Sequence, residues 1–568
     1  RKIKMPSDTP IWSPSPQRAE NTNLTAFMRT CGTSFSDYHS FWKWSCDNLE
    51  TFWNHVWDEC GVIGDKGETV LENSGHMMNA KFFPDARVNY AENLLKYKSD
   101  DTAIIFKHEQ GDERILSFAQ LHKQVSLWQQ YFVDLGIGEG DRVAGYLPNT
   151  PETVIACLAA TSLGAIWSSA SPDFGVQGII DRFGQIDPKI LITTDGYFYG
   201  GKTHDCLAKV QEALASLPSI EKTLIIPFTA ETPEIDGIAN GVLVTEALSH
   251  YNAKDTFFHR VPFNHPLFIM FSSGTTGAPK CIVHGHGGTL IQHLKEHQLQ
   301  CDVREGDRVF YFTTCGWMMW NWQISALACG AALILYDGSP FHPKKTSLWD
   351  YTSKHGCTLF GTASKYLDAL QKFKVKPAEL FDLSPLRTLT YTGSPLVHEG
   401  FDFVYQHIKQ DLHLCGLYGG TDIIAASFGI GNPISSVYRG EIQCSGLGVA
   451  IDVFDHDGTP LPNDGTSGEI VCVKPQPSMP IYFWDDPDHA KYKKAYFSTY
   501  EGIWHHGDWI AKTPHNGLIV YGRSDATLNP GGVRIGTAEI YRQVEQFEEV
   551  VESIAVGQDW RIQATLKS

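Results

Sequence analysis

FSSGTTGAPK, residues 271–280, combines four hydroxyl side chains, two glycines and a lysine, and it directly follows the apolar run from Pro266 to Met270. Glycines allow backbone N–H groups to turn inward as a concave anion-binding nest, and serine and threonine add hydrogen-bond donors without a fixed charge. Lys280 supplies a positive charge at the end of the segment. The segment therefore predicts a loop that binds phosphate.

Two other interpretations of this loop compete with phosphate binding of this kind. The P-loop of nucleotide hydrolases requires a glycine, four residues, and then Gly-Lys-Ser/Thr. Lys280 instead follows Pro279 and precedes Cys281, so the spacing excludes a P-loop. An ordinary surface turn rich in glycine and threonine is the second alternative, but the strand-like run in front of the loop favours phosphate binding.

The overall composition is that of a large globular protein. With 568 residues, of which 42% are hydrophobic and 19% charged, the chain can bury a large core, and it has no long repetitive tract. Its formal net charge of −18 argues against broad binding to nucleic acid or to an anionic membrane. Anionic ligands must therefore be bound by local donors.

Cysteine usage and hydropathy bear on the compartment. The 13 cysteines include no Cys-x-x-Cys pair, which indicates neither a disulfide framework nor a zinc module and favours a reducing compartment. The longest apolar run, Ile324 to Tyr336, is shorter than the ~20 residues that span a bilayer. The basic first residues are followed by no apolar signal-peptide core. We predict a cytosolic protein without a membrane span, while the sequence is silent on oligomeric state.

Apolar runs and turn residues predict the organisation of the chain. From Ala103 onward, short apolar runs alternate with helical patterns, which predicts an α/β fold with parallel sheets covered by helices. The runs are residues 103–106, 142–147, 189–194, 223–226, 308–314 and 331–336. Turns rich in Gly and Asp at 455–458 and 463–465 predict a more antiparallel, β-rich subdomain. Aromatic residues at near-helical spacing between Phe41 and Trp57 predict a helical appendage. We expect three regions: the appendage at 1–95, the main domain at 96–522, and a hinge with a small, incomplete α+β domain at 523–568.

At residues 272–280 the sequence resembles the adenylate-forming superfamily of acyl-CoA synthetases, whose signature loop is Ser-Ser/Gly-Gly-Thr-Thr-Gly-x-Pro-Lys. The resemblance extends from Asn89 to Glu549, and several segments, such as 316–322 and 522–539, are most similar to the members that activate acetoacetate. It implies an acid–thiol ligase that consumes ATP, acetoacetate and CoA, with Mg²⁺ as its metal. The acid would first become an acyl-adenylate.

The resemblance implies contacts to the phosphates from two motifs. The loop would surround the β- and γ-phosphates with Ser272, Ser273, Gly274, Thr275, Thr276, Gly277 and Lys280, of which Thr275 and Lys280 would be catalytic. The second motif is Tyr418-Gly419-Gly420-Thr421-Asp422, in which Thr421 would contact the α-phosphate and Asp422 would hold Mg²⁺, both with catalytic roles. The family has Glu where this chain has Asp422, so a bridging water is expected to take up the shorter reach. By itself the motif would be interpreted as a Gly-rich turn.

The adenosine contacts follow from the same resemblance. Tyr418 would stack on adenine beside the backbone of Gly393, Ser394 and Pro395, and Asp508 would accept the ribose hydroxyls. Arg523 would contact sugar and phosphate, Arg534 would face ATP, and Asp525 would be the hinge. His284 and His286 follow the phosphate loop but lack a third ligand at metal spacing, so we predict that they are structural.

The acid and CoA sites are also implied by resemblance. Trp317, Met318, Met319, Thr392 and Gly419 would line the acid pocket, and Trp167, Ser168, Ser169 and Gly532 would lie near CoA. Gly419 stands where acetate-activating members have Trp, so the missing indole predicts room for a longer acid. Thr392 and Asn321 are candidate hydrogen-bond donors to its ketone oxygen, because a buried polar contact discriminates strongly between substrates.

The C-terminal region departs from the family pattern. The family carries a Pro-x-x-x-x-Gly-Lys element whose lysine bridges the acyl carboxylate and the α-phosphate, and no such element follows Asp525. If the chain is complete, we expect adenylation to be impaired, because a positioned charge stabilises the transition state. Two alternative functions therefore stay open: another short-chain acyl-CoA synthetase, and a nucleotide-binding isoform with impaired catalysis.

Overall fold

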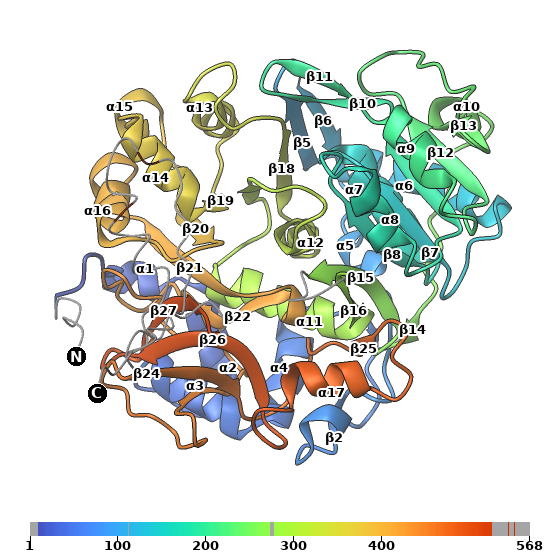
Figure 1. The fold of residues 1–568 in the computed structure, drawn as a ribbon. Helices are drawn as coiled ribbons and strands as arrows, with labels where there is room; N and C mark the ends of the chain where they lie inside the picture. Colours follow the sequence, from blue (N-terminus) through green and yellow to red (C-terminus); the bar gives the residue numbers. More distant parts are fainter. Residues whose placement is uncertain (1–8, 112, 273–277, 525–543, 545–549, 551–568) are drawn as a thin grey trace, which may run out of the picture.

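The computed structural model describes residues 9–111, 113–272, 278–524, 544 and 550. Its first large sheet has eight strands in the order β13-β12-β9-β7-β8-β15-β16-β25 (Figure 1). The strands are β13 (Gly241–Leu243), β12 (Lys222–Ile226), β9 (Ile190–Thr194), β7 (Arg142–Tyr146), β8 (Ile166–Ala170), β15 (Pro266–Ser272), β16 (Lys280–Gly285) and β25 (Tyr482–Phe483). The pairs from β13 to β15 are parallel, whereas β15 with β16 and β16 with β25 are antiparallel.

The second large sheet also has eight strands, in the order β22-β21-β20-β19-β17-β18-β5-β6. They are β22 (Ala425–Ile430), β21 (His413–Gly420), β20 (Thr388–Thr392), β19 (Leu359–Ala363), β17 (Arg308–Tyr311), β18 (Ala332–Asp337), β5 (Thr102–His108) and β6 (Arg114–Ser117). Its edge pairs β21–β22 and β5–β6 are antiparallel. The sheets are therefore mixed rather than wholly parallel. Short chain reversals, which need no crossover helix, join β15 to β16, β5 to β6 and β21 to β22, whereas β25 pairs with β16 from a distant part of the chain.

The β-rich subdomain expected after Asp452 is a four-stranded antiparallel sheet, which confirms that prediction. It contains β23 (Ile451–Phe454), β24 (Ser467–Cys472), β26 (Trp504–Lys512) and β27 (Leu518–Arg523) in chain order. Three smaller sheets have the orders β1-β4-β14, β2-β3 and β10-β11. Their strands are β1 (Gly64–Asp65), β4 (Arg87–Val88), β14 (Val261–Pro262), β2 (Leu71–Glu72), β3 (Lys81–Phe82), β10 (Gly196–Tyr199) and β11 (Lys202–Asp205).

Helices cover the sheets, and α11 lies between them. All residues of α11 (His286–Lys295) are buried, and it contacts β16 of the first large sheet and β22 of the second. The other helices are α1 (Pro16–Glu20), α2 (Asn23–Thr30), α3 (Tyr38–Asp47), α4 (Leu49–Glu59), α5 (Tyr90–Leu94), α6 (Phe118–Asp134), α7 (Pro151–Ser162), α8 (Val176–Phe183), α9 (Leu207–Leu214), α10 (Val244–Leu248), α12 (Met318–Ile324), α13 (Ser347–Lys354), α14 (Ser364–Lys372), α15 (Pro377–Leu380), α16 (His398–His407) and α17 (Ala490–Tyr496). Short turns of 3₁₀-helix form η1 (Met77–Asn79), η3 (Ser325–Cys329) and η4 (Thr421–Ile423), and η2 (Glu296–Gln300) is a short π-helix that continues α11. Among the helices of the described residues, none combines the length and the hydropathy that a membrane span requires.

Candidate active site

The predicted phosphate loop and the second motif meet through an ion pair. Lys280 is the first residue of β16, and Asp422 lies in η4, directly after β21 of the other large sheet. The Nζ of Lys280 donates to Oδ1 of Asp422 at 3.1 Å. Two motifs that are 142 residues apart in the chain are thus in direct contact.

Asp422 stays ionised although its surroundings are poorly solvated. The hydroxyl of Tyr496, the last residue of α17, also donates to its Oδ1. Burial raises the pKa of Asp422, but Lys280, the nearby His506 and the Tyr496 hydroxyl together lower it to about 2. The site therefore holds a fixed negative charge beside a lysine.

The expected adenosine contacts also converge. The hydroxyl of Tyr418 on β21 donates to Oδ2 of Asp508 on β26 at 2.7 Å. Nη1 of Arg523, at the end of β27, lies 3.6 Å from Oδ1 of Asp508. The second large sheet and the antiparallel subdomain thus bring these three side chains together.

His506 lies near both the Lys280–Asp422 ion pair and the adenosine group, which consists of Tyr418, Asp508 and Arg523. Its ring packs edge-on against Phe428, and its Nε2 is 3.6 Å from Oδ2 of Asp508. Burial lowers the pKa of His506, and the carboxylates of Asp508 and Asp422 oppose that shift. Arg523 and Lys280 act in the same direction as burial, because their positive charges disfavour a proton on His506.

The strands that flank the phosphate loop form a hairpin. Ser272 ends β15 and pairs with Lys280 across the antiparallel β15–β16 ladder. The predicted contacts Ser273, Gly274, Thr275, Thr276 and Gly277 lie outside the described residues. Arg534, Gly532 and the hinge residue Asp525 also lie outside them.

The Gly393-Ser394-Pro395 segment follows β20, next to the strand that carries Tyr418. Gly393 has a φ of +89°, which a side chain would strain. The carbonyl of Ser394 accepts a hydrogen bond of 2.6 Å from Ser364 Oγ. These contacts fix the backbone of the segment at the end of the strand.

The residues expected near CoA lie on β8 and line a cavity. Trp167, Ser168 and Ser169 line it together with Gly316 and Asn321. The two serine hydroxyls are bound to backbone carbonyls: Ser168 donates to Ile269 at 2.8 Å and Ser169 to Cys315 at 2.6 Å. The cavity therefore connects the expected CoA residues with the segment that begins α12.

The expected acid-pocket residues differ in their surroundings. Met318 and Met319 are buried at the start of α12, whereas Trp317 is 65% exposed. Thr392 donates its hydroxyl hydrogen to the carbonyl of Leu417 at 2.7 Å. A Cβ atom on Gly419 would lie 2.0 Å from the carbonyl oxygen of Ala425, so the backbone itself demands glycine there.

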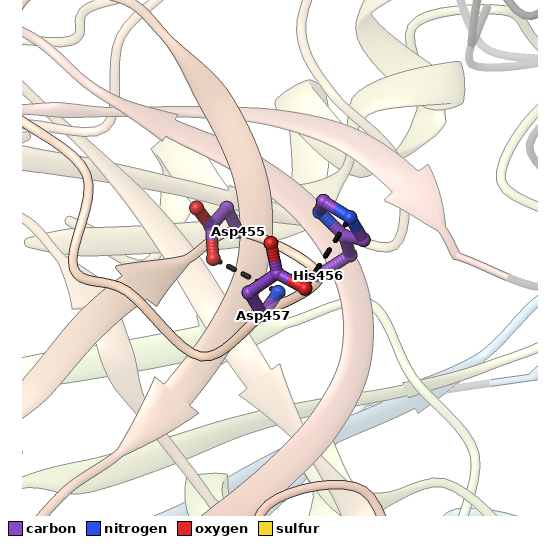
Figure 2. Close-up of side chains that lie close together, drawn as sticks. All are labelled: Asp455, His456 and Asp457. Carbon is purple, nitrogen blue, oxygen red and sulfur yellow. Dashed lines mark hydrogen bonds and ion pairs between the residues drawn. The ribbon is translucent and has the colours of Figure 1, made fainter.

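The chemistry of the donor set suits a magnesium ion at Asp422. Its carboxylate is ionised, and both of its hydrogen bonds from described residues reach Oδ1, which leaves Oδ2 as a hard oxygen donor. Another set of possible ligands, Asp455, His456 and Asp457, lies in the turn after β23 (Figure 2). Oδ1 of Asp455 accepts hydrogen bonds from the backbone N–H groups of Asp457 and Thr459. These bonds stabilise the turn and account for Asp455 without a metal ion.

Two side chains of the site escaped prediction from the sequence. Tyr496 binds Asp422, and its ring stacks on Trp504 with centroids 3.7 Å apart. His506 lies two residues before Asp508, which was the available signal, but its position near the carboxylates of Asp508 and Asp422 was not evident. No local pattern distinguished Tyr496 from a core aromatic residue.

Comparison with known proteins defines the class. A family model for AMP-binding enzymes matches residues 91–483, and a model for the acetyl-coenzyme A synthetase N-terminus matches residues 38–94. The chain therefore belongs to the AMP-binding enzymes, which implies that it uses ATP.

Individual relatives narrow the class to one family. An acetoacetyl-coenzyme A synthetase of Rhizobium meliloti (strain 1021) is 50% identical over 564 residues, covering 98% of this chain and 86% of the relative. The acetoacetyl-CoA synthetase of Gallus gallus is 43% identical, covering 96% and 84%. A solved acetoacetyl-CoA synthetase from Streptomyces lividans superimposes with a TM-score of 0.91 at 39% identity, covering 97% of this chain and 85% of that one. The chain is a member of the acetoacetyl-CoA synthetase family, with the α/β fold predicted from its sequence.

Proposed function

We propose that this chain is an acetoacetate–CoA ligase, which converts ATP, acetoacetate and CoA into AMP, diphosphate and acetoacetyl-CoA. In the first step a carboxylate oxygen of the acid bonds to the α-phosphorus, and the bond to diphosphate breaks. In the second step the CoA thiol attacks the acyl carbon, and AMP leaves with the bonding electron pair. The observation that carries the proposal is the meeting of Lys280 and Asp422 beside the group formed by Tyr418, Asp508 and Arg523.

Positioned charge is the main requirement of the first step, because the acid and ATP are both anions. We assign Lys280 to the β- and γ-phosphates and the Thr421 hydroxyl to the α-phosphate. No described residue forms a hydrogen bond with that hydroxyl, so it is available to a ligand. Asp422 would hold Mg²⁺, whose charge offsets that of the phosphates.

The nucleoside would be oriented by the second group. Asp508 would accept the ribose hydroxyls, and Arg523 would contact the sugar and a phosphate. Tyr418 would stack on adenine, because it lies on β21 beside β20, which leads into the Gly393-Ser394-Pro395 segment. CoA would approach along β8 beside Trp167, because that strand lines the cavity that reaches Asn321.

The ketone oxygen of the acid needs a donor, and the structure favours Asn321 over Thr392. The hydroxyl hydrogen of Thr392 is already donated to Leu417. Asn321 is 4% exposed and lines the cavity, and no described residue forms a hydrogen bond with its side-chain amide. A relative named malonamoyl-CoA synthetase, from Penicillium aethiopicum, is 37% identical. A malonamoyl group also carries a second carbonyl, which is consistent with a pocket that recognises this oxygen.

We further infer that the reaction takes place in a reducing compartment such as the cytosol. All 13 cysteines are free thiols, and 12 of them are buried. Disulfides form and persist mainly in oxidising compartments.

The test is a panel of acids with the purified chain, ATP and Mg²⁺. Diphosphate release and thioester formation should be at least about tenfold more efficient with acetoacetate than with acetate, as expected when a buried polar contact reads the substrate. Malonamic acid and butyrate are the informative comparisons, because the first retains the second carbonyl and the second lacks it. Preference for butyrate would favour another short-chain synthetase. ATP binding without diphosphate release would favour the non-catalytic alternative.

A further inference from the structure

One face of β16 is directed at the turn that carries Thr421 and Asp422. Side chains two residues apart lie on the same face of a strand, so Lys280, Ile282 and His284 point together. Lys280 binds the carboxylate of Asp422, and Ile282 packs in the hydrophobic cluster that contains Tyr418 and Ile423. His284 is the third contact on this face.

His284 holds the backbone of Thr421. Its Nε2 donates to the carbonyl oxygen of Thr421 at 2.7 Å, and the same oxygen accepts the N–H of Ile424 at 3.2 Å. The imidazole is 1% exposed, and its Nδ1 has no partner among the described residues. Burial lowers the pKa of His284 to about 4, which keeps the ring neutral. Leaving one buried nitrogen unsatisfied is costly, so the bond to Thr421 is the evident reason for a histidine here.

The other end of the turn is held by a second buried histidine. Ile424 has a φ of +46°, a left-handed conformation that a β-branched side chain strongly disfavours. Nε2 of His293, on α11, donates to the carbonyl oxygen of Ile424 at 2.5 Å. With Nε2 protonated, Nδ1 is an acceptor, and it lies 2.7 Å from Ser325 Oγ. The surrounding structure thus keeps a strained residue in place.

We propose that His284 and His293 are positioning residues, which hold the carbonyl oxygens at the two ends of the 421–424 turn and so place Thr421 and Asp422 for the nucleotide. The inference rests on the proposed function. Neither histidine contacts a reacting atom. Each one fixes the backbone from which the Thr421 hydroxyl and the Asp422 carboxylate project.

The test compares glutamine with leucine at both positions, because glutamine retains an N–H near the place of Nε2 and leucine does not. His284→Leu and His293→Leu should lower kcat/KM for ATP by about tenfold to 100-fold, since a displacement on the order of 1 Å can cost that much. For His284→Leu, the KM for acetoacetate should change by less than about threefold, because Met318, Met319 and Asn321 lie on α12 rather than on the turn. No such limit applies to His293→Leu, because His293 also bonds to Ser325, whose hydroxyl contacts the carbonyl oxygen of Asn321. His284→Gln and His293→Gln should recover most of the loss.

His413→Leu is the matched control. His413 is also 1% exposed, burial lowers its pKa to about 4, and its Nδ1 has no described partner, but its Nε2 bonds to Gln443 rather than to the turn. This variant should melt at a lower temperature and retain kcat/KM for ATP. The inference is wrong if the leucine variants at 284 and 293 behave like the control, or if glutamine restores nothing.

Calorimetric titration with ATP and Mg²⁺, without acid, separates this inference from the proposed function. If the wild type binds ATP but makes no acetoacetyl-CoA, the proposed function fails. Weaker ATP binding by His284→Leu than by His413→Leu would then still support the positioning role, and equal binding would contradict it. A wild type that binds no ATP would contradict both.

Discussion

Gly419 has no room for a side chain where it passes the neighbouring strand. Acetate-activating relatives have Trp at this position, so glycine predicted a larger acid pocket. A more immediate reason for glycine is that a Cβ atom here would lie 2.0 Å from the carbonyl oxygen of Ala425. Any side chain would push β21 away from β22, and Tyr418 and Thr421 lie on either side of the contact. Substitution by tryptophan would therefore disturb the nucleotide contacts as well as fill the pocket.

We expect Gly419→Ala to destabilise the fold by about 1–3 kcal/mol, the usual cost of forcing extra atoms into a packed site. Urea denaturation would measure the loss. Gly138→Ala is the control, because a Cβ atom at Gly138 meets nothing within 4 Å and its φ is ordinary. If the two variants are equally stable, β22 can shift at Ala425 at little energetic cost. The size of the acid pocket would then be the only remaining reason for glycine.

The N-terminal helices are built into the main core. Ser45 of α3 accepts the N–H of Gly448 at 2.9 Å, and a Cβ atom on Gly448 would meet the rings of Phe52 and Trp53 on α4. Trp53 is fully buried in the hydrophobic cluster that also contains Phe268 of β15. These helices therefore support the sheet that carries the phosphate loop.

Trp53→Ala should lower the free energy of unfolding by about 3–5 kcal/mol, the range for removing a large buried aromatic side chain. Trp53→Phe should cost clearly less, about 1–2 kcal/mol, because the indole N–H has no described partner to lose. Denaturant melts of the two variants would test this pair. A loss from phenylalanine as large as that from alanine would mean that the N–H matters.

Sequence patterns predicted elements better than contacts between them. The runs at 103–106, 142–147, 189–194 and 223–226 correspond to β5, β7, β9 and β12, because buried strands are marked by continuous apolar residues. The antiparallel edges were missed, since an apolar run does not encode strand direction. The composition of residues 271–280 indicated Lys280, and the family resemblance implied Asp422, Asp508 and Arg523. Tyr496 and the positioning roles of His284 and His293 depend on contacts that no local pattern records.

For the molecule as a whole, buried histidines set the response to acid. Six of them have a pKa lowered by burial: His284, His286, His293, His297, His413 and His506. Below pH 6.5, the ordinary pKa of histidine, the unfolded chain binds protons that the folded chain does not bind. The free energy of unfolding therefore decreases as the pH falls. Three buried carboxyl groups act in the opposite direction, but they are fewer than the histidines. Burial raises the pKa of Asp302 and Glu441, and it raises that of Asp337 to about 7.

We therefore expect the free energy of unfolding to decrease steadily from pH 6.5 to pH 5. For His413, with a folded-state pKa of about 4, the loss over this interval is on the order of 2 kcal/mol. Urea melts at pH 7.5, 6.5 and 5.0 would measure how steeply the free energy of unfolding falls with pH. His413→Gln should weaken that dependence by close to one bound proton. A flat profile would show that these rings become protonated without unfolding the chain.

The hydrogen bond from Tyr418 to Asp508 has a consequence for turnover. If Asp508 accepts the ribose hydroxyls, an arriving nucleotide competes with a phenol that already occupies one carboxylate oxygen, and part of the recognition energy is lost in the exchange. When AMP leaves, the Tyr418 hydroxyl donates to Asp508 again, so that the carboxylate keeps a hydrogen-bond donor. The hydrogen bond between Tyr418 and Asp508 therefore lowers the affinity for the nucleotide and speeds its release. Fast release suits an enzyme that must release AMP in every cycle.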